Sequence, residues 1–239
     1  MNVRLERVRA RDNEVAVLAY EARRPRGVGL VVGHGYSSSK HNLDFMCGFL
    51  ASHGFAVYSL DFPGHKLGAS GGLLRGVDDC VDAMSAVVAH ARARQPGPLL
   101  TAGHSMGAMT ALLAAAADPE VAGAIAIATG YGRPTAIEAL KNVGGTDFRS
   151  GYVDGVSLPE LVRGVDARYD EALPKLVGRP LLFVAAAKDA MVSRASVEDL
   201  YARAPEPKTF ETVESDHTYA GDNARGTLLQ WLNELFPRA

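Results

Sequence analysis

The seven residues Ala102-Gly103-His104-Ser105-Met106-Gly107-Ala108 decide how this chain is expected to fold. A strand-like run at residues 98–102 leads into them, and a run rich in Ala, Leu and Met at residues 106–117 leads out as a helix. Because the two glycines have no β-carbon, the strand and the helix can approach closely and Ser105 can adopt a strained backbone conformation. The pattern therefore predicts a sharp turn that projects the Ser105 hydroxyl beside a helix N-terminus, where negative charge is favoured.

The composition is that of a folded protein without a strong charge of either sign. The chain has 239 residues, of which 47% are apolar and 22% charged, and its formal net charge is −2. This size suits one large α/β domain or two small ones, and no linker separates two parts of the chain. The charge argues against nucleic acid or an anionic membrane as the main partner. The N-terminus lacks the apolar segment of a secretory signal and no apolar run could span a bilayer, so we expect a cytoplasmic location.

The two cysteines, Cys47 and Cys80, lie in apolar helical contexts and have no metal-ligand spacing. A free cysteine in such a context behaves as a small apolar side chain. We therefore expect two buried free thiols and no metal site.

Strand and helix patterns alternate along most of the chain. Residues 3–10 and 14–22 flank a turn and are predicted to form an antiparallel hairpin. Six further short runs, most of them almost continuously apolar, are predicted as strands: 27–33, 55–60, 98–102, 122–128, 179–186 and 208–213. Helices are expected at residues 42–53, 77–94, 106–117, 193–204 and 223–236, the last capped by Asp222 or Asn223. This order predicts an α/β fold: a mostly parallel eight-stranded sheet with an antiparallel start and helices on both faces.

Two residues downstream of Ser105 are candidates to activate it. A serine hydroxyl is a weak nucleophile and needs a base that is itself oriented by an acid. Catalytic groups of parallel sheets gather at the carboxyl ends of the strands. Asp189 follows the strand at residues 179–186, and His217 follows the next one. We take them as acid and base; Asp216 is interpreted as a loop-capping residue, and Asp61, also at a strand end, precedes Ser105 in the chain.

Five motifs resemble those of the α/β-hydrolase superfamily. They are Gly103-His104-Ser105-Met106-Gly107, His34-Gly35-Tyr36, Asp61-Phe62-Pro63-Gly64-His65, Lys188-Asp189-Ala190-Met191-Val192 and Ser215-Asp216-His217. The order nucleophile, acid, histidine is that of the superfamily, and the resemblance extends over essentially the whole chain. Within the superfamily, His34-Gly35-Tyr36 followed by Ser39-Lys40-His41 is similar to small bacterial esterases of the cinnamoyl/feruloyl-esterase and serine-aminopeptidase-like group.

The resemblance implies a role for each site residue. Ser105 attacks a carbonyl carbon, His217 takes and later returns the proton, and Asp189 fixes the tautomer of the histidine. The backbone N–H groups of Met106 and Tyr36 are expected to form the oxyanion hole. The mechanism requires neither a metal nor an organic cofactor.

The segment at about residues 131–178 interrupts the alternation and stands where this superfamily places a cap. It carries four aromatic residues, Tyr131, Phe148, Tyr152 and Tyr169. Its charges are of both signs: Arg133, Lys141, Arg149, Arg163 and Arg168 against Asp147, Asp154, Glu160, Asp166, Asp170 and Glu171. We take Tyr131 and Tyr152, together with His34, as candidate substrate-binding residues. The alternative is that the aromatic residues only pack the cap onto the body. The charges favour a small or medium-sized, partly polar acyl substrate over a lipid.

Two loops carry separate expectations. The loop Gly64-His65-Lys66-Leu67-Gly68-Ala69-Ser70 is longer than the Gly-His-Gly-x-Ser common in the superfamily, and we expect it to reshape one wall of the pocket. Gly144-Gly145 in the predicted cap is either a hinge or a turn.

Three functional hypotheses follow. The first is a serine hydrolase that cleaves a carboxylic ester or thioester of a small molecule through an acyl-enzyme. The second keeps the acyl-enzyme but changes the acceptor, as in an acyltransferase, a macrocyclase or an amide hydrolase. The third is a non-catalytic binding protein with the same fold, since fold does not fix function. A carrier-protein or homodimer partner cannot be read from the sequence.

Overall fold

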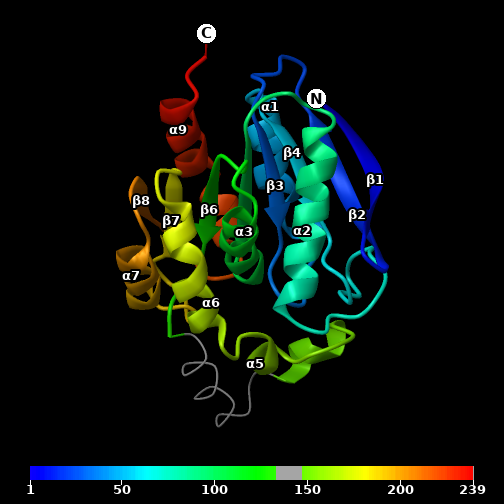
Figure 1. Cartoon of the computed structure of the whole chain (residues 1–239), viewed down its shortest axis with the longest axis vertical. Coiled ribbons are helices and arrows are strands. Elements are labelled where there is room, and N and C mark those ends of the chain that lie inside the picture. The colour runs from blue at the N-terminus through cyan, green and yellow to red at the C-terminus, as the bar shows by residue number, and fades with distance from the viewer. Residues whose placement is uncertain (133–146, 239) are drawn as a thin grey trace.

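The computed structural model describes residues 1–132 and 147–238, which form an eight-stranded sheet between two layers of helices (Figure 1). Across the sheet the strands are ordered β1-β2-β4-β3-β5-β6-β7-β8. Their bounds are β1 Asn2–Ala10, β2 Asn13–Glu21, β3 Gly29–Gly33, β4 Ala56–Leu60, β5 Leu99–His104, β6 Gly123–Ile127, β7 Leu181–Ala186 and β8 Lys208–Val213.

The strand directions are those predicted for an α/β sheet with an antiparallel start. β1 and β2 form the expected hairpin, with Asn2 opposite Glu21 and Ala10 opposite Asn13. β2 is also antiparallel to β4, whereas all the other neighbouring strands are parallel. Every residue of β3, β5, β6 and β7 is buried, which explains why these strands are almost entirely apolar. The predicted fold class is confirmed.

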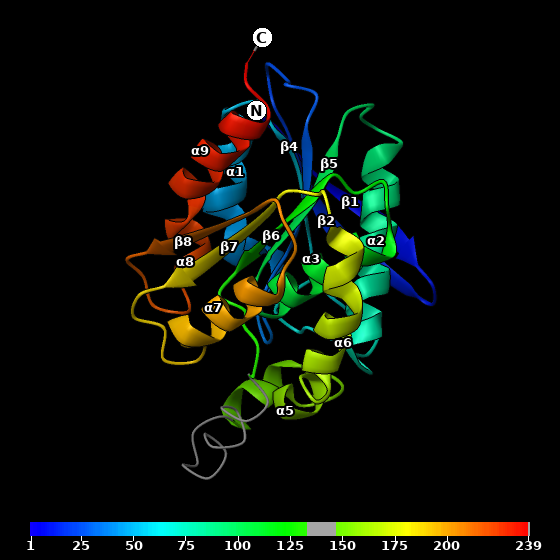
Figure 2. The ribbon, with the colours of Figure 1, turned by 60° about the vertical axis from the view of Figure 1, so that its left-hand side comes forward.

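Helices cover both faces of the sheet, as the two views of the ribbon show (Figures 1 and 2). One face packs against α2 (Val77–Arg92), α3 (Met106–Ala117), α6 (Val165–Ala172) and α7 (Arg194–Arg203). The other packs against α1 (Asp44–Ser52), α8 (Ala220–Asn223) and α9 (Arg225–Leu235). Successive strand residues alternate between the two cores. Cys47 and Cys80 are buried free thiols, one in each core, as predicted. None of the described helices is long and apolar enough to cross a membrane.

Two predicted helices begin differently from expectation. The expected helix at residues 42–53 is preceded by a 3-10 turn, η1 (Lys40–Leu43), because the backbone N–H of Lys40 is held by the distant carboxylate of Asp61. The predicted caps of the last helix are wrong: α9 begins after Ala224, which makes no side-chain cap. Asp222 lies in the separate helix α8 and accepts a hydrogen bond from the N–H of Met46 at 3.1 Å, so it joins α8 to α1.

The described part of the predicted cap consists of short helices. These are η2 (Asp147–Tyr152), α5 (Leu158–Leu161), α6 and η3 (Leu173–Leu176). Both views place α5 beyond the carboxyl ends of the parallel strands (Figures 1 and 2). Tyr169 of α6 is fully buried in the core, and its hydroxyl lies 3.1 Å from that of Thr129. The predicted hinge or turn at Gly144-Gly145 lies outside the described residues.

Candidate active site

Ser105 lies at the tight turn between β5 and α3, at the carboxyl edge of the sheet. Its φ of 55° is positive, a conformation that costs free energy for a residue with a β-carbon. The turn is possible because the residues two positions before and after Ser105 are glycines. A β-carbon on Gly103 would lie 2.2 Å from the backbone of Gly107, and one on Gly107 would lie 2.0 Å from the carbonyl oxygen of Gly33. The close approach of strand and helix that the two glycines predicted is thus present.

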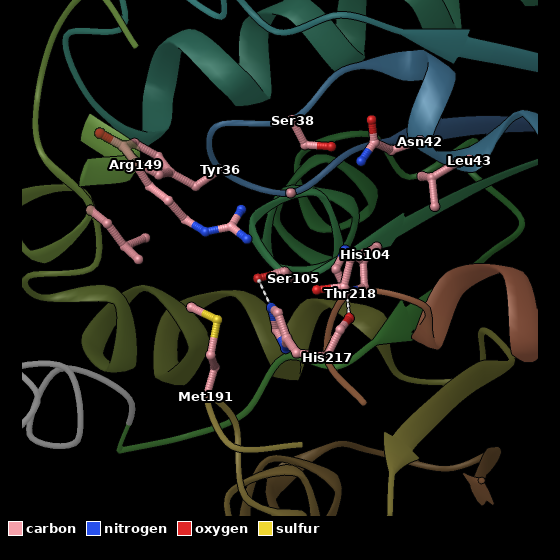
Figure 3. Close-up of a pocket in the computed structure, with 12 residues that line it drawn as sticks. Tyr36, Ser38, Asn42, Leu43, His104, Ser105, Arg149, Met191, His217 and Thr218 are labelled. Carbon is pink, nitrogen blue, oxygen red and sulfur yellow. Dashed lines mark hydrogen bonds between the residues drawn. The ribbon is translucent and has the colours of Figure 1, made fainter. Parts of the chain in front are cut away.

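His217 and Asp189 form a hydrogen-bonded chain with Ser105, and Figure 3 shows its link between Ser105 and His217. His217 follows β8, and its Nε2 lies 3.0 Å from the Ser105 Oγ. Its Nδ1 lies 2.7 Å from the Oδ2 of Asp189, which follows β7. These distances are those of a nucleophile, a base and an orienting acid.

The carboxylate of Asp189 is fully buried yet stays ionised over a wide pH range. Burial by itself raises its pKa, but the hydrogen bond from His217 and the backbone N–H groups of Met191 and Val192 outweigh it and leave the pKa below its ordinary value. Both N–H groups donate to Oδ1 at 2.8 Å, so Oδ2 is left to face the histidine. The acid is therefore fixed in charge and in orientation.

His104 is a further residue of the site, and the sequence alone did not single it out. Its Nε2 lies 2.7 Å from the backbone carbonyl oxygen of His217, and the two rings are 4.8 Å apart. His104 thereby ties the loop after β8 to the end of β5. It therefore holds the backbone of the residue whose ring contacts Ser105.

The loop after β3 passes next to Ser105 and carries Tyr36. A β-carbon on Gly35 would lie 3.2 Å from the His104 ring and 3.5 Å from the Ser105 β-carbon, so glycine lets the loop come this close. The Tyr36 hydroxyl donates to the Val156 carbonyl at 3.0 Å. Met106 is the first residue of α3, where backbone N–H groups have no partner within the helix. The backbone N–H of Met106, at the start of α3, and that of Tyr36, on the loop after β3, therefore belong to two segments that lie next to Ser105.

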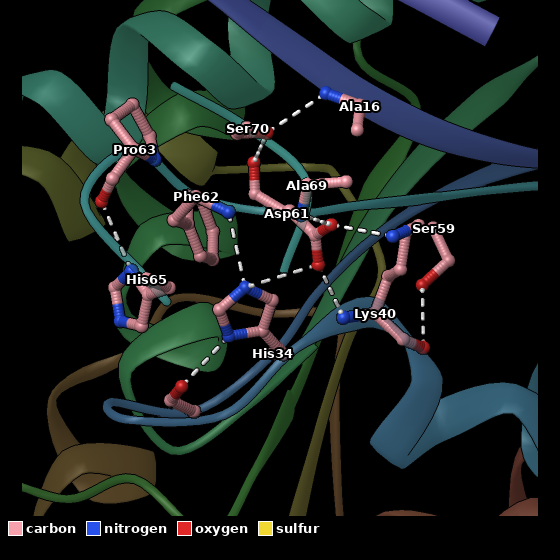
Figure 4. Close-up of polar contacts among 11 residues, drawn as sticks. Ala16, His34, Lys40, Ser59, Asp61, Phe62, Pro63, His65, Ala69 and Ser70 are labelled. Carbon is pink, nitrogen blue, oxygen red and sulfur yellow. Dashed lines mark hydrogen bonds and ion pairs between the residues drawn. The ribbon is translucent and has the colours of Figure 1, made fainter. Parts of the chain in front are cut away.

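A buried ion pair supports this loop from behind (Figure 4). The Lys40 Nζ lies 2.5 Å from the Oδ2 of Asp61, and both side chains are almost completely buried. Asp61 also accepts the backbone N–H groups of Lys40 and Ala69, each at 2.7 Å. Burial alone would raise the pKa of Asp61, but these hydrogen bonds, chiefly that of the Lys40 side chain, hold it below its ordinary value. Asp61 lies at a strand end as expected, but it has a lysine partner and no contact with His217 among the described hydrogen bonds.

His34 lies inside this network and not on the surface of the pocket. Its side chain is fully buried, its Nε2 accepts the N–H of Phe62 at 3.0 Å, and its Nδ1 lies 2.8 Å from the Gly35 carbonyl oxygen. Burial and the neighbouring His65 lower the pKa of His34 to about 3, so it is neutral at physiological pH. His34 supports the loop, and in this structure it cannot touch a substrate.

A pocket opens in front of Ser105 (Figure 3). It encloses a cavity of about 50 Å³. The described residues that line it are Gly35, Tyr36, Ser38, Asn42, Leu43, His104, Ser105, Arg149, Leu158, Met191, His217 and Thr218. They come from the loop after β3, from the turn at Ser105, from η2 and α5, and from the loops after β7 and β8, so the pocket is built where the carboxyl ends of the strands converge.

The two candidate tyrosines lie elsewhere. The Tyr131 hydroxyl donates to Asp170 at 2.9 Å, and the guanidinium of Arg203 lies 3.8 Å from the centre of its ring. Tyr152 is 45% exposed and does not line the pocket. The contacts of Tyr131 fit the alternative stated above, in which an aromatic residue packs the segment onto the body. The side chain of Phe148 lies outside the described residues.

The long loop at residues 64–70 does not line the pocket either. It pairs with the chain after η2: the N–H of Asp154 donates to the Gly64 carbonyl at 2.8 Å, and that of Lys66 to the Tyr152 carbonyl at 3.0 Å. The loop can therefore reshape a wall of the pocket only through the segment that it holds. Arg149 and Leu158 of that segment line the pocket.

The described residues contain no cluster of three or more His, Cys, Asp or Glu side chains that could hold a metal ion.

Comparison with known proteins places the chain among enzymes with this arrangement of strands. The model of the family described as serine aminopeptidase, S33, matches residues 23–152, which is more than half of the chain. No curated protein matches the sequence.

Solved structures share the fold over nearly the whole chain. Est1E from Butyrivibrio proteoclasticus, solved with ferulic acid bound, is 18% identical with a TM-score of 0.74, over 96% of this chain and 97% of that one. The thioesterase domain from the curacin biosynthetic pathway is 16% identical with a TM-score of 0.67, over 97% and 99%. A serine hydrolase without a lid from Xanthomonas campestris is 20% identical with a TM-score of 0.70, over 100% and 97%.

Proposed function

The chain belongs to the serine aminopeptidase S33 family of α/β hydrolases, and we propose that it cleaves a carboxylic ester or thioester of a small molecule through an acyl-enzyme intermediate. The observation that carries this proposal is the hydrogen-bonded chain from the Ser105 Oγ through His217 to the Asp189 carboxylate, with distances of 3.0 and 2.7 Å. The strained backbone of Ser105, which aims its hydroxyl at the pocket, supports the same assignment.

In the first half of the proposed reaction, the Ser105 Oγ attacks the carbonyl carbon and His217 Nε2 takes its proton. The ionised Asp189 stabilises the imidazolium that results, through the hydrogen bond from Nδ1. The oxygen of the tetrahedral intermediate accepts the N–H groups of Met106 and Tyr36. When the intermediate collapses, His217 gives the proton to the leaving alcohol or thiol, and the acyl group stays on Ser105.

In the second half, water attacks the acyl-enzyme. His217 removes a proton from the water, and the same two N–H groups stabilise the new oxyanion. When this second intermediate collapses, the bond between the acyl carbon and the Ser105 Oγ breaks, His217 gives its proton to that oxygen, and the acid is released. Each N–H donor of such an oxyanion hole typically lowers the barrier by about 3–4 kcal/mol.

The size of the cavity supports a small acyl group. Its volume of about 50 Å³ is well below the roughly 300–1,000 Å³ of pockets that enclose drug-sized ligands. Ester and thioester substrates fit the structural relatives, which include an enzyme solved with ferulic acid bound and a thioesterase domain. The alcohol or thiol of such a substrate leaves readily, which suits a mechanism in which His217 donates the proton to the leaving group.

The test is the hydrolysis of p-nitrophenyl acetate and of a short acyl thioester by the wild-type protein and two serine variants. Ser105→Ala is expected to lower kcat by about 10⁴-fold or more, since it removes the nucleophile. Ser38→Ala is the matched control, because Ser38 lines the same pocket without a contact to His217 among the described hydrogen bonds. We expect it to retain kcat within about threefold. A folded wild-type protein that cleaves neither substrate, or a Ser105→Ala variant as active as the wild type, would overturn the proposal.

A further inference from the structure

The side chain of Met191 lines the pocket in front of Ser105 and comes from the loop that carries the acid. This loop connects β7 to α7, and Met191 is the second residue after Asp189. Of the described aliphatic side chains that line the pocket, that of Met191 is partly exposed, whereas Leu43 and Leu158 are packed in the two cores. A smaller residue at this position would therefore enlarge the pocket more than it would disturb the core.

The backbone of Met191 has a role of its own, which does not depend on its side chain. Its N–H donates to the Asp189 Oδ1 at 2.8 Å, and the N–H of Val192 donates to the same oxygen at 2.8 Å. At the end of the loop, Ser193 caps α7, since its Oγ accepts the N–H of Ser196 at 3.2 Å. Because these bonds hold the loop at both ends, a substitution of Met191 changes the lining of the pocket while Asp189 keeps its partners.

The two sides of the pocket offer different contacts to a substrate. In Figure 3, Met191 and Arg149 lie on one side of Ser105, and the thioether of Met191 points into the pocket. Ser38 and Asn42 lie on the other side, where a hydroxyl and an amide can form hydrogen bonds. An alkyl chain gains free energy by covering apolar surface, which the thioether provides. The acyl chain therefore fits against Met191, and the polar side suits the leaving group or the attacking water.

Building on the proposed hydrolase function, we propose that Met191 is a specificity-determining residue whose side chain limits the length of the acyl group. The cavity has a volume of about 50 Å³, so a side chain that projects into it decides how many methylene groups fit. Methionine suits this role because its unbranched, flexible side chain adapts to the group that it contacts. The substrates that follow are esters or thioesters of short aliphatic acids.

The experiment measures kcat/KM for the p-nitrophenyl esters of acetic, butyric, hexanoic and octanoic acid. The wild-type protein should prefer acetate or butyrate to the two longer esters. The variant Met191→Ala lacks the γ-carbon, the sulfur and the ε-carbon, which leaves room for roughly two to three methylene groups. Since each buried methylene contributes about fourfold, the ratio of hexanoate to acetate kcat/KM should rise by about 10- to 60-fold.

Three further variants separate the size of the side chain from effects on the loop. Met191→Leu nearly preserves the volume, so the ratio should stay within about threefold of the wild-type value. Val192→Ala is the matched control, because the Val192 side chain is buried and does not line the pocket, while its N–H also holds Asp189. Its hexanoate to acetate ratio should equal that of the wild type, whatever its rates. Met191→Phe is larger and should lower the ratio of butyrate to acetate, which keeps the inference testable if Met191→Ala does not fold.

A second series separates the acyl group from the leaving group. Phenyl acetate and 2-naphthyl acetate share the acetyl group and differ in the size of the alcohol. Met191→Ala should change the ratio of their kcat/KM values by less than about threefold, because the alcohol lies on the other side of the pocket. A larger change here than in the acyl series would put the leaving group against Met191 and overturn the inference.

Three other results would overturn the inference while leaving the proposed hydrolase function intact, provided that a fluorophosphonate labels Ser105 of the wild-type protein. The first is a wild-type protein that prefers octanoate to acetate. The second is a hexanoate to acetate ratio that is the same in Met191→Ala and in the wild type. The third is a ratio that Val192→Ala raises as much as Met191→Ala does. If the wild-type protein is not labelled and cleaves no ester, the hydrolase function fails and the inference fails with it.

Discussion

Replacing Lys40 by methionine would remove the charge that balances the buried carboxylate of Asp61 while nearly preserving the volume of the side chain. Removing one partner of a buried ion pair typically costs about 3–5 kcal/mol. Asp61 would keep two backbone N–H bonds at 2.7 Å, from Lys40 and Ala69, so we expect the lower end, about 3 kcal/mol. For a chain of this length that corresponds to a fall in Tm of about 6–12 °C.

The cost should also depend on pH, and its sign follows from the pKa of Asp61. In the wild-type protein this pKa is below its ordinary value, so the carboxylate stays ionised and paired down to about pH 4. Without the Lys40 ammonium, burial would raise the pKa, and the folded variant would take up a proton as the pH falls through the raised value. The stability difference between the two proteins should therefore shrink from pH 7 toward pH 5.

The assay is urea unfolding of the wild type, Lys40→Met and the control Lys66→Met across that pH range. Lys66 forms an exposed ion pair with Asp154 at 3.0 Å, which should contribute less than about 1 kcal/mol at any pH. Because Lys40 lies on the loop that carries Tyr36, we also expect kcat of Lys40→Met to fall by about tenfold. A cost as small as that of Lys66→Met, or a cost that does not change with pH, would refute this reasoning.

Three further predictions concern the buried groups. Burial lowers the pKa of His34 to about 3, whereas in the unfolded chain this imidazole takes up a proton near pH 6.5. The free energy of unfolding, measured in urea, should therefore fall below pH 6.5 by up to about 1.4 kcal/mol per pH unit. A free energy of unfolding that stays constant between pH 6.5 and 5 would contradict this. Burial raises the pKa of Cys47 to about 12 and also raises that of Cys80, so a thiol reagent should modify neither thiol in the native protein and both in urea. Gly107→Ala should destabilise the fold by about 2 kcal/mol or more in thermal unfolding, because its β-carbon would meet a β3 carbonyl oxygen at 2.0 Å; Gly226→Ala, with open space at its β-carbon, should not.

The elements predicted best from the sequence are those whose limits are set by local chemistry. The helix at Met106–Ala117 begins after the Ser105 turn and ends before Asp118-Pro119, and the predicted and observed bounds coincide. The strand Lys208–Val213 also coincides. The start of α1 and the cap of α9 differ from the prediction because each depends on a hydrogen bond between distant parts of the chain. Asp61 accepts the backbone N–H of Lys40, and Asp222 accepts that of Met46 instead of capping α9.

The three residues of the hydrogen-bonded chain were identifiable because topology places them. Ser105, Asp189 and His217 each follow a strand, and the carboxyl ends of parallel strands meet at one edge. His104 and Arg149 were not identifiable in the same way. His104 acts through the backbone of a residue 113 positions later in the chain, and Arg149 was one of several charges in an irregular segment whose path the sequence pattern does not specify.

The ion pair of Lys40 with Asp61 was hidden for a different reason. Lysine is almost never fully buried unless it is paired, so its sequence context predicts exposure. Only the fold brings the Lys40 side chain to the end of β4, where its Nζ lies 2.5 Å from the Oδ2 of Asp61. The candidate substrate residues Tyr131 and Tyr152 show the converse, since their aromatic character indicated a pocket while their neighbours in the fold direct them elsewhere.

The most direct test of the central claim is to react the native protein with a fluorophosphonate and to locate the adduct by peptide mass spectrometry. We expect one adduct per chain, on Ser105, whose formation is abolished in Ser105→Ala, strongly slowed in His217→Ala and unchanged in Ser38→Ala. A folded protein that takes no label, or one labelled on Ser37, Ser38 or Ser39 in place of Ser105, would contradict it.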